Sequence, residues 1–280
     1  MVASFAVGAL NLRPPADAAA SVVGQTSGVE TPATDIIPGA EAQSWAGGAD
    51  GVLVLHGFTG SPHSVRPWAE AIAAEGYTVE LPLLPGHGTS LQDMMTTSWA
   101  DWSSAADAAY LDLAARCERV AVAGLSMGGT LATWLAAEHP EIVGLALVNP
   151  AVKPQTELAE FLLPMIEAGE TLIDAIGSDI AKEGVVELAY PGTPLIPLAS
   201  LGEAIDELQP RLPSVRQPVL LLTSPQDHVV PPASSDHLAE LVAGPVERVT
   251  LERSYHVATL DHDADLIAER TIEFLAKRFV

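Results

Sequence analysis

The chain has 280 residues, of which 48% are hydrophobic, so it can bury a substantial core as one domain with an insertion. Its 36 acidic residues outnumber 13 basic ones, and the resulting net charge of −23 argues against nucleic acid or an anionic membrane surface as a partner. The single cysteine, Cys117, cannot form an internal disulfide, so the fold does not require an oxidising compartment.

Residues 1–34 are rich in Ala, Ser, Thr and Pro and show no hydrophobic periodicity, which predicts a disordered tail. Within them, residues 2–10 are mildly apolar but lack a basic region before them and are too short to span a bilayer. We therefore expect a cytoplasmic protein, with a secretory signal as the alternative.

Strand and helix patterns alternate from residue 51 to residue 148. This alternation predicts an α/β fold with a mainly parallel sheet and helices on both faces. We expect strands at 51–55, 77–81, 119–123 and 142–148, and helices at 65–74, 99–115 and 128–138.

The pattern changes between residues 150 and 213. Helix-like pieces at 157–170, 172–176 and 201–207 are interrupted by prolines, and their apolar content argues against disorder. We expect this segment to form a compact cap over the site, inserted between two parts of one core, 35–149 and 214–280. The alternative is a set of extra helices that pack away from the site.

The stretch Gly124-Leu125-Ser126-Met127-Gly128 lies between a buried strand pattern and a helix pattern. A serine at such a corner exposes its hydroxyl on strained backbone, and small neighbours avoid a clash. Ser126 is therefore the candidate nucleophile. We expect the Met127 N–H, at the start of the helix, and the Phe58 N–H, in the loop 56–60, to form an oxyanion hole.

A nucleophilic serine needs a base, and the base needs an orienting acid. Asp227 follows the apolar run 218–223, and His256 follows the alternating run 246–251, so each lies on the exit loop of a predicted strand. We assign Asp227 as the acid and His256 as the base, with His262 as the alternative base. No group of His, Asp and Glu has the helical spacing of a zinc site, so we expect no metal and no cofactor.

These motifs resemble the bacterial monoacylglycerol lipase family of α/β-hydrolases, which is close to the thermophilic carboxylesterases. The resemblance runs from about residue 37 to the C-terminus and is weakest over 150–175. Its matching stretches are HGFTGSPHS at 56–64, 66–68, 76–81, GHGT at 86–89, 124–131, DHVVPP at 227–232 and SYHVATLD at 254–261. In the predicted cap, 176–179 and 187–190 match as well.

The resemblance implies the α/β-hydrolase fold with a small cap, and the same triad and oxyanion residues. It also implies that Glu187 hydrogen-bonds the glycerol hydroxyls and that Ile176 lines the pocket. We therefore expect a serine hydrolase that cleaves monoacylglycerols to glycerol and fatty acid. A general carboxylesterase for short simple esters is the alternative. The expected partner is a small lipid ester, and an apolar cap rim would allow transient contact with a membrane or micelle.

Overall fold

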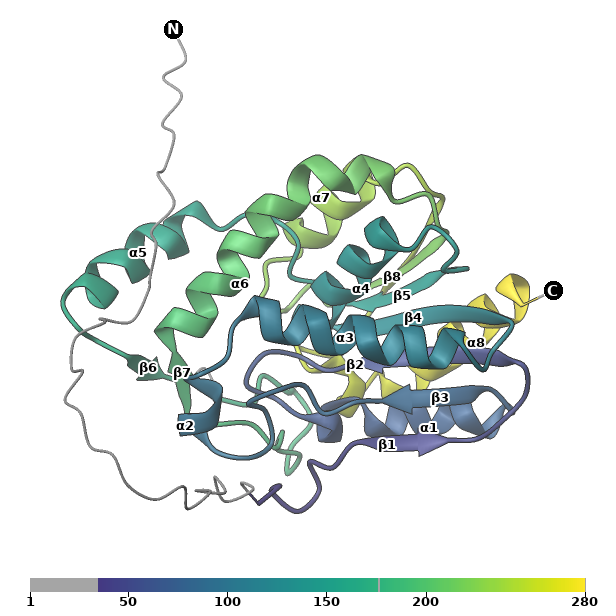
Figure 1. Cartoon of the computed structure of the whole chain (residues 1–280), viewed down its shortest axis with the longest axis horizontal. Coiled ribbons are helices and arrows are strands. Elements are labelled where there is room, and N and C mark those ends of the chain that lie inside the picture. Colours follow the sequence, from purple (N-terminus) through teal and green to yellow (C-terminus); the bar gives the residue numbers. More distant parts are fainter. Residues whose placement is uncertain (1–34, 176, 280) are drawn as a thin grey trace, which may run out of the picture. The chain divides into compact units, whose positions relative to one another are not determined.

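The computed structural model describes residues 35–175 and 177–279; the predicted tail at 1–34 and the predicted pocket residue Ile176 lie outside them. Within these ranges, seven strands form one sheet in the order β1-β3-β2-β4-β5-β8-β9, and only β1 runs antiparallel to its neighbour (Figure 1). This sheet confirms the predicted fold class. Its strands are β1 (Gln43–Trp45), β2 (Asp50–Leu55), β3 (Thr78–Leu81), β4 (Arg119–Leu125), β5 (Leu145–Val148), β8 (Val219–Thr223) and β9 (Val246–Thr250).

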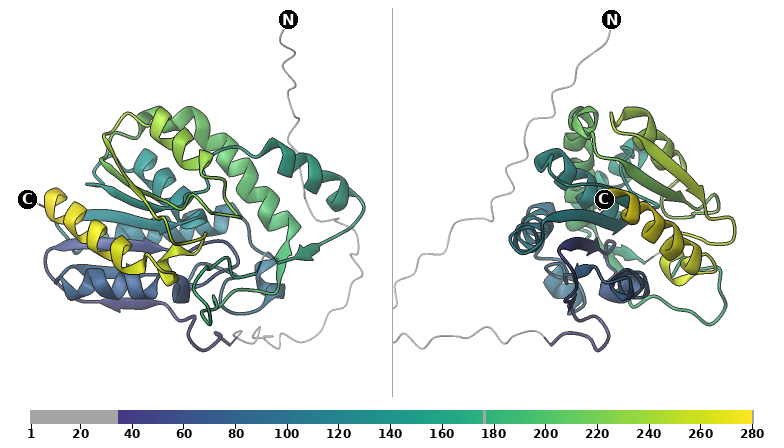
Figure 2. Two further views of the ribbon diagram at one scale, coloured as in Figure 1. Left: turned by 180° about the vertical axis from the view of Figure 1, so that it is seen from behind. Right: turned by 90° about the vertical axis from the view of Figure 1, so that its right-hand side faces the viewer.

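Helices cover both faces of the sheet (Figure 2). Alternate residues of each strand enter different cores, so that Leu53 packs with α3, α4 and α6 whereas Val52 packs with α1 and α8. The helices are α1 (Arg66–Ala74), α2 (Leu91–Met94), α3 (Trp99–Ala114), α4 (Met127–Glu138), α5 (Thr156–Glu167), α6 (Leu195–Leu208), α7 (Ala233–Leu241) and α8 (Ala264–Arg278), with 3₁₀ turns at Pro62–Ser64, Gln209–Ser214 and Ala258–Leu260.

The helix ends follow from local chemistry. Ser98 begins α3 with a capping box, because its N–H donates to Asp101 Oδ2 at 2.9 Å while its side chain faces the N3 backbone. Gly76 ends the turn after α1 with φ of 92°, a conformation that favours glycine. The helices predicted at 65–74, 99–115 and 128–138 are confirmed within two residues.

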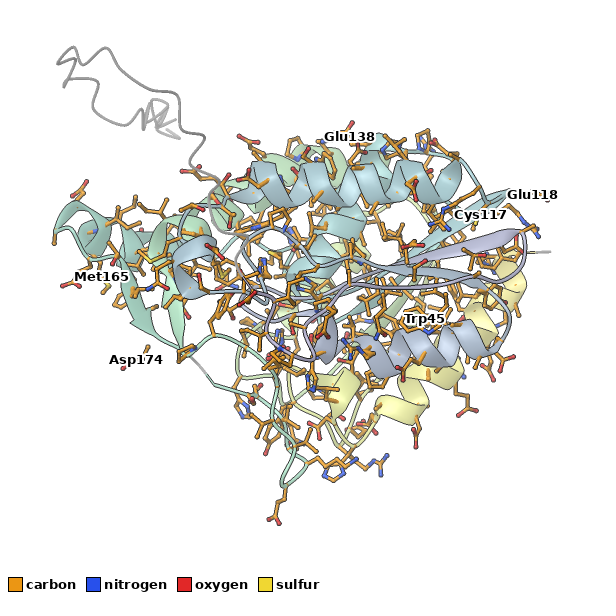
Figure 3. All side chains as sticks on the ribbon, turned by 60° about the horizontal axis from the view of Figure 1, so that its bottom comes forward. Trp45, Cys117, Glu118, Glu138, Met165 and Asp174 are labelled. Carbon is orange, nitrogen blue, oxygen red and sulfur yellow. The ribbon has the colours of Figure 1, made fainter. Side chains whose placement is uncertain are left out.

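The segment between β5 and β8 contains α5, α6 and a small two-stranded sheet. The predicted helix at 172–176 is wrong, because Leu172–Asp174 forms β6, which pairs antiparallel with β7 (Gly192–Pro194). The pairing partner lies about twenty residues along the chain, so local periodicity could not indicate it. Figure 3 places Met165 and Asp174 at the opposite end of the molecule from Glu118, which directly precedes β4. The segment therefore lies toward the carboxyl ends of the parallel strands.

Candidate active site

Ser126 stands at the sharp corner between β4 and α4, with φ of 57° and ψ of −117°. A non-glycine residue in such backbone stores about 1–3 kcal/mol of strain. The neighbouring glycines are sterically required: a Cβ on Gly124 would lie 2.2 Å from the Gly128 carbonyl oxygen, and one on Gly128 would lie 2.1 Å from the Leu55 oxygen. The corner is held by the Ser126 N–H, which donates to the Val148 oxygen at 3.0 Å.

Asp227 and His256 leave the ends of adjacent strands, β8 and β9, and form a buried hydrogen-bonded pair. Nδ1 of His256 lies 2.7 Å from Oδ2 of Asp227, and their side chains are 8% and 1% exposed. The other oxygen, Oδ1, accepts the backbone N–H groups of Val229 and Val230, each at 2.8 Å. Because the carboxylate accepts a hydrogen bond from Nδ1–H, Nε2 of the neutral ring is left with a free lone pair, which is the state a general base requires.

The loop after β2 lies directly against Ser126. A Cβ built on Gly57 would be 3.4 Å from Ser126 Cβ, so the backbone that carries Phe58 passes beside the serine. Met127 is the first residue of α4, where backbone N–H groups have no partner within the helix. The ring of Phe58 packs edge-on against Trp102, at 5.6 Å between centroids, as part of the core.

Two buried histidines support this loop. Nε2 of His56 accepts the Leu84 N–H at 3.2 Å, which leaves Nδ1 to donate to the Gly57 oxygen at 3.0 Å. Burial lowers the pKa of His56 to about 4. Burial, together with repulsion from His56 at 5.0 Å between ring centroids, lowers the pKa of His87 to about 3. Both rings are therefore neutral at pH 7. His56 braces the loop by hydrogen bonds, whereas His87 bonds to the Pro85 oxygen of its own loop at 3.0 Å and supports the loop after β2 only through ring contacts with His56 and Phe58.

Glu187 reaches the loop after β2 from the segment between β5 and β8. Its Oε1 would lie 2.7 Å from a Cβ on Gly60. Burial raises the pKa of the Glu187 carboxyl, while the nearby His256 and the Ser64 hydroxyl partly oppose that shift. A desolvated carboxylate with spare lone pairs beside the loop that carries Phe58 is suited to accept hydrogen bonds from a polar ligand.

Hydrogen bonds fasten the stretch around Glu187 to the body of the protein. Ser61 Oγ donates to the Leu188 oxygen at 3.1 Å, and the Tyr190 N–H donates to the Thr59 oxygen at 3.1 Å. The Tyr190 hydroxyl also donates to the Gly86 oxygen at 2.8 Å. Glu187 is thereby fixed next to the predicted oxyanion loop.

Asn149, at the end of β5, is a buried site residue that the sequence analysis missed. Its Nδ2 donates to the His256 carbonyl oxygen at 2.8 Å, and its Oδ1 accepts the Ser224 N–H at 2.8 Å. Asn149 thus joins the loops that follow β8 and β9. An asparagine directly after an apolar strand marks the position in the sequence, but nothing local indicates its partners in the loops after β8 and β9.

The alternative base His262 is exposed and precedes α8. Of the residues described, no three His, Cys, Asp or Glu side chains are grouped so that they could hold a metal ion. None of the described helices is long and apolar enough to cross a membrane.

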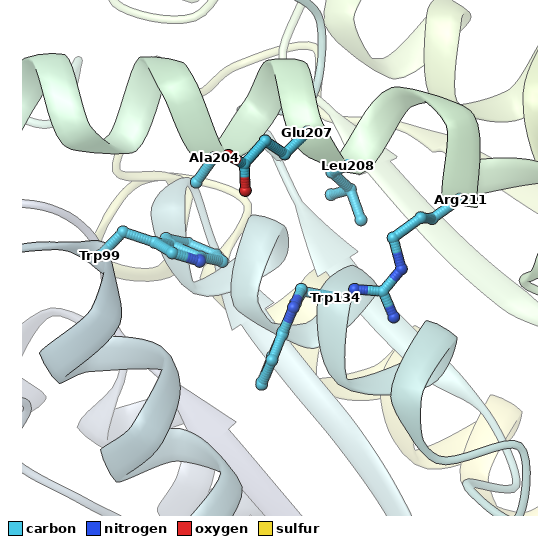
Figure 4. A pocket seen from close by; sticks show the side chains of 6 residues that line it. All are labelled: Trp99, Trp134, Ala204, Glu207, Leu208 and Arg211. Atoms are coloured by element: carbon cyan, nitrogen blue, oxygen red, sulfur yellow. The ribbon is translucent and has the colours of Figure 1, made fainter. Parts of the chain in front are cut away.

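Two hollows in the described part of the chain are lined by none of the predicted site residues. The smaller, of about 100 Å³, lies between α3, α4 and α6 and contains none of the predicted site residues (Figure 4). The larger is an open groove of about 560 Å³ at the base of α5, between Lys153, Phe161 and Ser234. Ser234 Oγ accepts the Val152 N–H at 2.9 Å, so this groove adjoins the chain that leaves β5 beside Ser126.

The alpha/beta hydrolase family model matches residues 52–270, and the chain belongs to this family. The thermostable monoacylglycerol lipase of Bacillus sp. (strain H-257) is 43% identical over 250 residues, which cover 86% of this chain and 96% of that protein. This relative confirms the resemblance found in the sequence. The carboxylesterase of Bacillus subtilis (strain 168) is 26% identical over 84% of this chain and 95% of its own length.

Solved structures agree with the fold. A structure from a study of two metagenome-derived lipolytic enzymes, LipS and LipT, superposes with a TM-score of 0.83 at 41% identity and covers 87% of this chain and 100% of its own. The monoacylglycerol lipase of Paleococcus ferrophilus superposes with a TM-score of 0.71 over 85% of this chain and 98% of its own. At 17% identity, that second match supports the fold alone.

Proposed function

We propose that the protein is a serine hydrolase that cleaves monoacylglycerols to glycerol and a free fatty acid. The observation that carries the chemistry is the buried 2.7 Å pair of His256 and Asp227, on loops that follow β8 and β9 of the same mainly parallel sheet whose strand β4 ends at the strained Ser126 corner. The 43% identity to a monoacylglycerol lipase supports the choice of substrate.

In the proposed reaction, His256 takes the proton of Ser126 as the hydroxyl attacks the ester carbonyl. The Phe58 and Met127 amides donate to the oxyanion of the tetrahedral intermediate. Protonated His256 then gives its proton to the departing glycerol oxygen, and Asp227 stabilises the charged ring during this exchange. Water repeats the sequence on the acylated Ser126 and releases the fatty acid.

Substrate selection is assigned to the segment 150–213, which we propose acts as a cap. Glu187 would accept hydrogen bonds from the two free glycerol hydroxyls, and the pocket would close at that end, so di- and triacylglycerols would not fit. Support comes from the burial of Glu187 against Gly60. Each buried CH₂ of an acyl chain contributes about 0.8 kcal/mol, so an apolar tunnel favours longer chains without polar contacts. Ile176 is proposed to line that tunnel.

The cap also carries exposed apolar side chains, including Phe161, Leu163 and Ile196. They support the proposal of transient contact with a membrane or micelle that presents the lipid. A cytoplasmic location is also proposed, and the single cysteine supports it.

The test compares initial rates on 1-monolaurin, dilaurin and p-nitrophenyl butyrate for the wild type, Ser126→Ala and Ser104→Ala. Ser104 is an exposed serine of α3 and serves as the matched control. We expect monolaurin turnover that is lost only in Ser126→Ala, with dilaurin untouched. Equal turnover of monolaurin and dilaurin would contradict the proposed selectivity.

The alternative, a general carboxylesterase, has support from the Bacillus subtilis relative. Glu187→Ala distinguishes the two activities. In a monoacylglycerol lipase, this change should lower monolaurin turnover far more than butyrate ester turnover. Butyrate activity without monolaurin activity in the wild type would instead identify the esterase.

A further inference from the structure

The Asp179 carboxylate binds both loops that carry the candidate base and acid. Its Oδ2 accepts the His256 N–H at 3.0 Å and the His228 N–H at 3.1 Å. Its Oδ1 lies 2.8 Å from Nδ1 of His228, which follows Asp227 directly. The Asp179 side chain is 10% exposed, whereas its partner His228 is 59% exposed, so of these charge-assisted bonds the one to the His256 N–H is the more sheltered from water.

This arrangement fixes the spacing between two independent loops. The His256 loop leaves β9 and the Asp227 loop leaves β8, and a single oxygen of Asp179 accepts one N–H from each. A backbone hydrogen bond supports the same connection, since the Val257 N–H donates to the main-chain carbonyl oxygen of Asp179 at 3.1 Å. Any displacement of Asp179 would therefore move the His256 ring relative to its acid and to Ser126.

Asp179 belongs to the stretch that also carries Glu187. The Glu187 N–H donates to Ser178 Oγ at 2.8 Å, so the proposed alcohol-binding carboxylate is tied to the residue next to Asp179. One short stretch thus holds the group proposed to bind the alcohol and supports the backbone of the base.

We propose that Asp179 is a positioning residue that sets the geometry of the His256–Asp227 pair from within the segment 150–213. This inference rests on the proposed function. It assigns to that segment a part in catalysis in addition to substrate selection. Asp179 touches no reacting atom and acts through the backbone of His256 and His228.

A simpler possibility is that Asp179 merely anchors the segment, and Asp261 provides the comparison. The Asp261 carboxylate accepts the N–H groups of Ala181 at 2.7 Å and Lys182 at 2.9 Å. It also accepts the Tyr255 N–H at 2.9 Å, so it anchors the same segment without bonding to His256 or to the Asp227 loop. Asp261→Asn is therefore the matched control for anchoring, and the exposed Glu183→Gln is the control for loss of charge.

The experiment measures the rate at which a small fluorophosphonate labels Ser126, and kcat and KM for p-nitrophenyl butyrate and 1-monolaurin, in the full-length protein. Asp179→Asn keeps an oxygen that can accept both N–H groups, whereas Asp179→Glu keeps the charge but moves it by one methylene. We expect Asp179→Glu to lower the labelling rate and kcat about 10–100-fold with little change in KM, because a small misplacement of a catalytic group costs that much. Asp179→Asn should stay within a few-fold of the wild type.

Three results would overturn the proposal in folded variants. They are wild-type labelling by Asp179→Glu, a loss in Asp179→Asn as large as that in Asp179→Glu, or an equal loss in Asp261→Asn. Circular dichroism establishes that each variant is folded. A wild type that resists labelling would refute the serine hydrolase itself, whereas one that labels but spares monolaurin would refute only the substrate. Both results are distinct from the failure of the Asp179 proposal.

Discussion

Gly60 lies directly against Glu187: a methyl group on Gly60 would be 2.7 Å from Oε1 of the carboxylate. The end of a glutamate side chain can move, so Gly60→Ala should fold and displace Glu187 rather than disrupt the backbone. Loss of one well-placed hydrogen bond to glycerol should lower kcat/KM for 1-monolaurin by about tenfold, equivalent to about 1.4 kcal/mol. The rate on p-nitrophenyl butyrate, which has no glycerol, should change less. An equal loss on both substrates would place the effect on the oxyanion loop instead.

The raised pKa of Glu187 predicts that this residue destabilises the fold at neutral pH. Its folded-state pKa lies above the unfolded value, so the folded state binds the extra proton, and stability falls as the pH rises through the folded pKa. Glu187→Gln removes this dependence and should raise the thermal midpoint at pH 8, with an advantage that shrinks toward pH 4.5. The exposed Glu183→Gln should show no such trend. Parallel curves for Glu187→Gln and the wild type would contradict the assignment.

The positions of Ser126, Asp227 and His256 could be predicted because each follows a strand that its own residues define. The apolar run 219–222 indicates a buried strand without knowledge of its neighbours in the sheet, and the structure buries all four residues. The glycines at 124 and 128 likewise indicate a tight turn, because a side chain at either position would clash with backbone. Parallel strands end at one edge of the sheet, so the loops that carry these three residues leave the sheet at the same edge. Their catalytic roles stay predictions until the variants are measured.

Residues that act through distant backbone could not be predicted in this way. Asn149 and Asp179 bind N–H and C=O groups of loops that lie 49–107 positions away, and no local pattern indicates such partners. The small sheet of β6 and β7 was missed for the same reason, since Leu172 reads as helical until Pro194 is placed opposite it. Local periodicity predicts helices and strands, whereas the contacts that join loops depend on how those helices and strands are arranged in the complete fold.

The buried pair His56 and His87 should make stability sensitive to acid. Unfolded histidine takes up a proton near pH 6.5, whereas burial lowers the folded pKa to about 4 for His56 and about 3 for His87. The unfolded state therefore binds more protons below pH 6.5, so stability is full above that pH. It is lost as the pH falls toward 4, by about 1.4 kcal/mol per pH unit for each histidine.

Urea unfolding of His87→Asn tests this dependence. The asparagine amide can still donate to the Pro85 oxygen, which His87 Nδ1 faces at 3.0 Å, but it does not titrate. Between pH 6.5 and 5 the free energy of unfolding should fall less steeply in this variant, by about 1.4 kcal/mol per pH unit. The exposed His262→Asn should keep the wild-type slope. Identical slopes in all three proteins would show that His87 is protonated in the fold.

Gly128→Ala should prevent folding, because its Cβ would meet the Leu55 carbonyl oxygen of β2 at 2.1 Å and neither backbone can yield. We expect a loss above about 4 kcal/mol, measured as absence of soluble protein with native circular dichroism. Gly202→Ala is the matched control, since that helical glycine in α6 has no atom within 4 Å of the added Cβ. It should stabilise the fold by about 0.5–1 kcal/mol. Normal folding of Gly128→Ala would require a different backbone at the serine corner.

The strain at Ser126 predicts a difference between two inactive variants. Ser126→Ala keeps a Cβ at φ of 57° and ψ of −117°, whereas Ser126→Gly removes it and lets the same backbone relax. Relief of about 1–3 kcal/mol of strain is larger than the roughly 0.5–1 kcal/mol by which the extra entropy of an unfolded glycine destabilises the fold. Ser126→Gly should therefore unfold at a higher temperature than Ser126→Ala, while neither variant hydrolyses ester. A lower midpoint for Ser126→Gly would mean that the corner imposes no strain on the nucleophile.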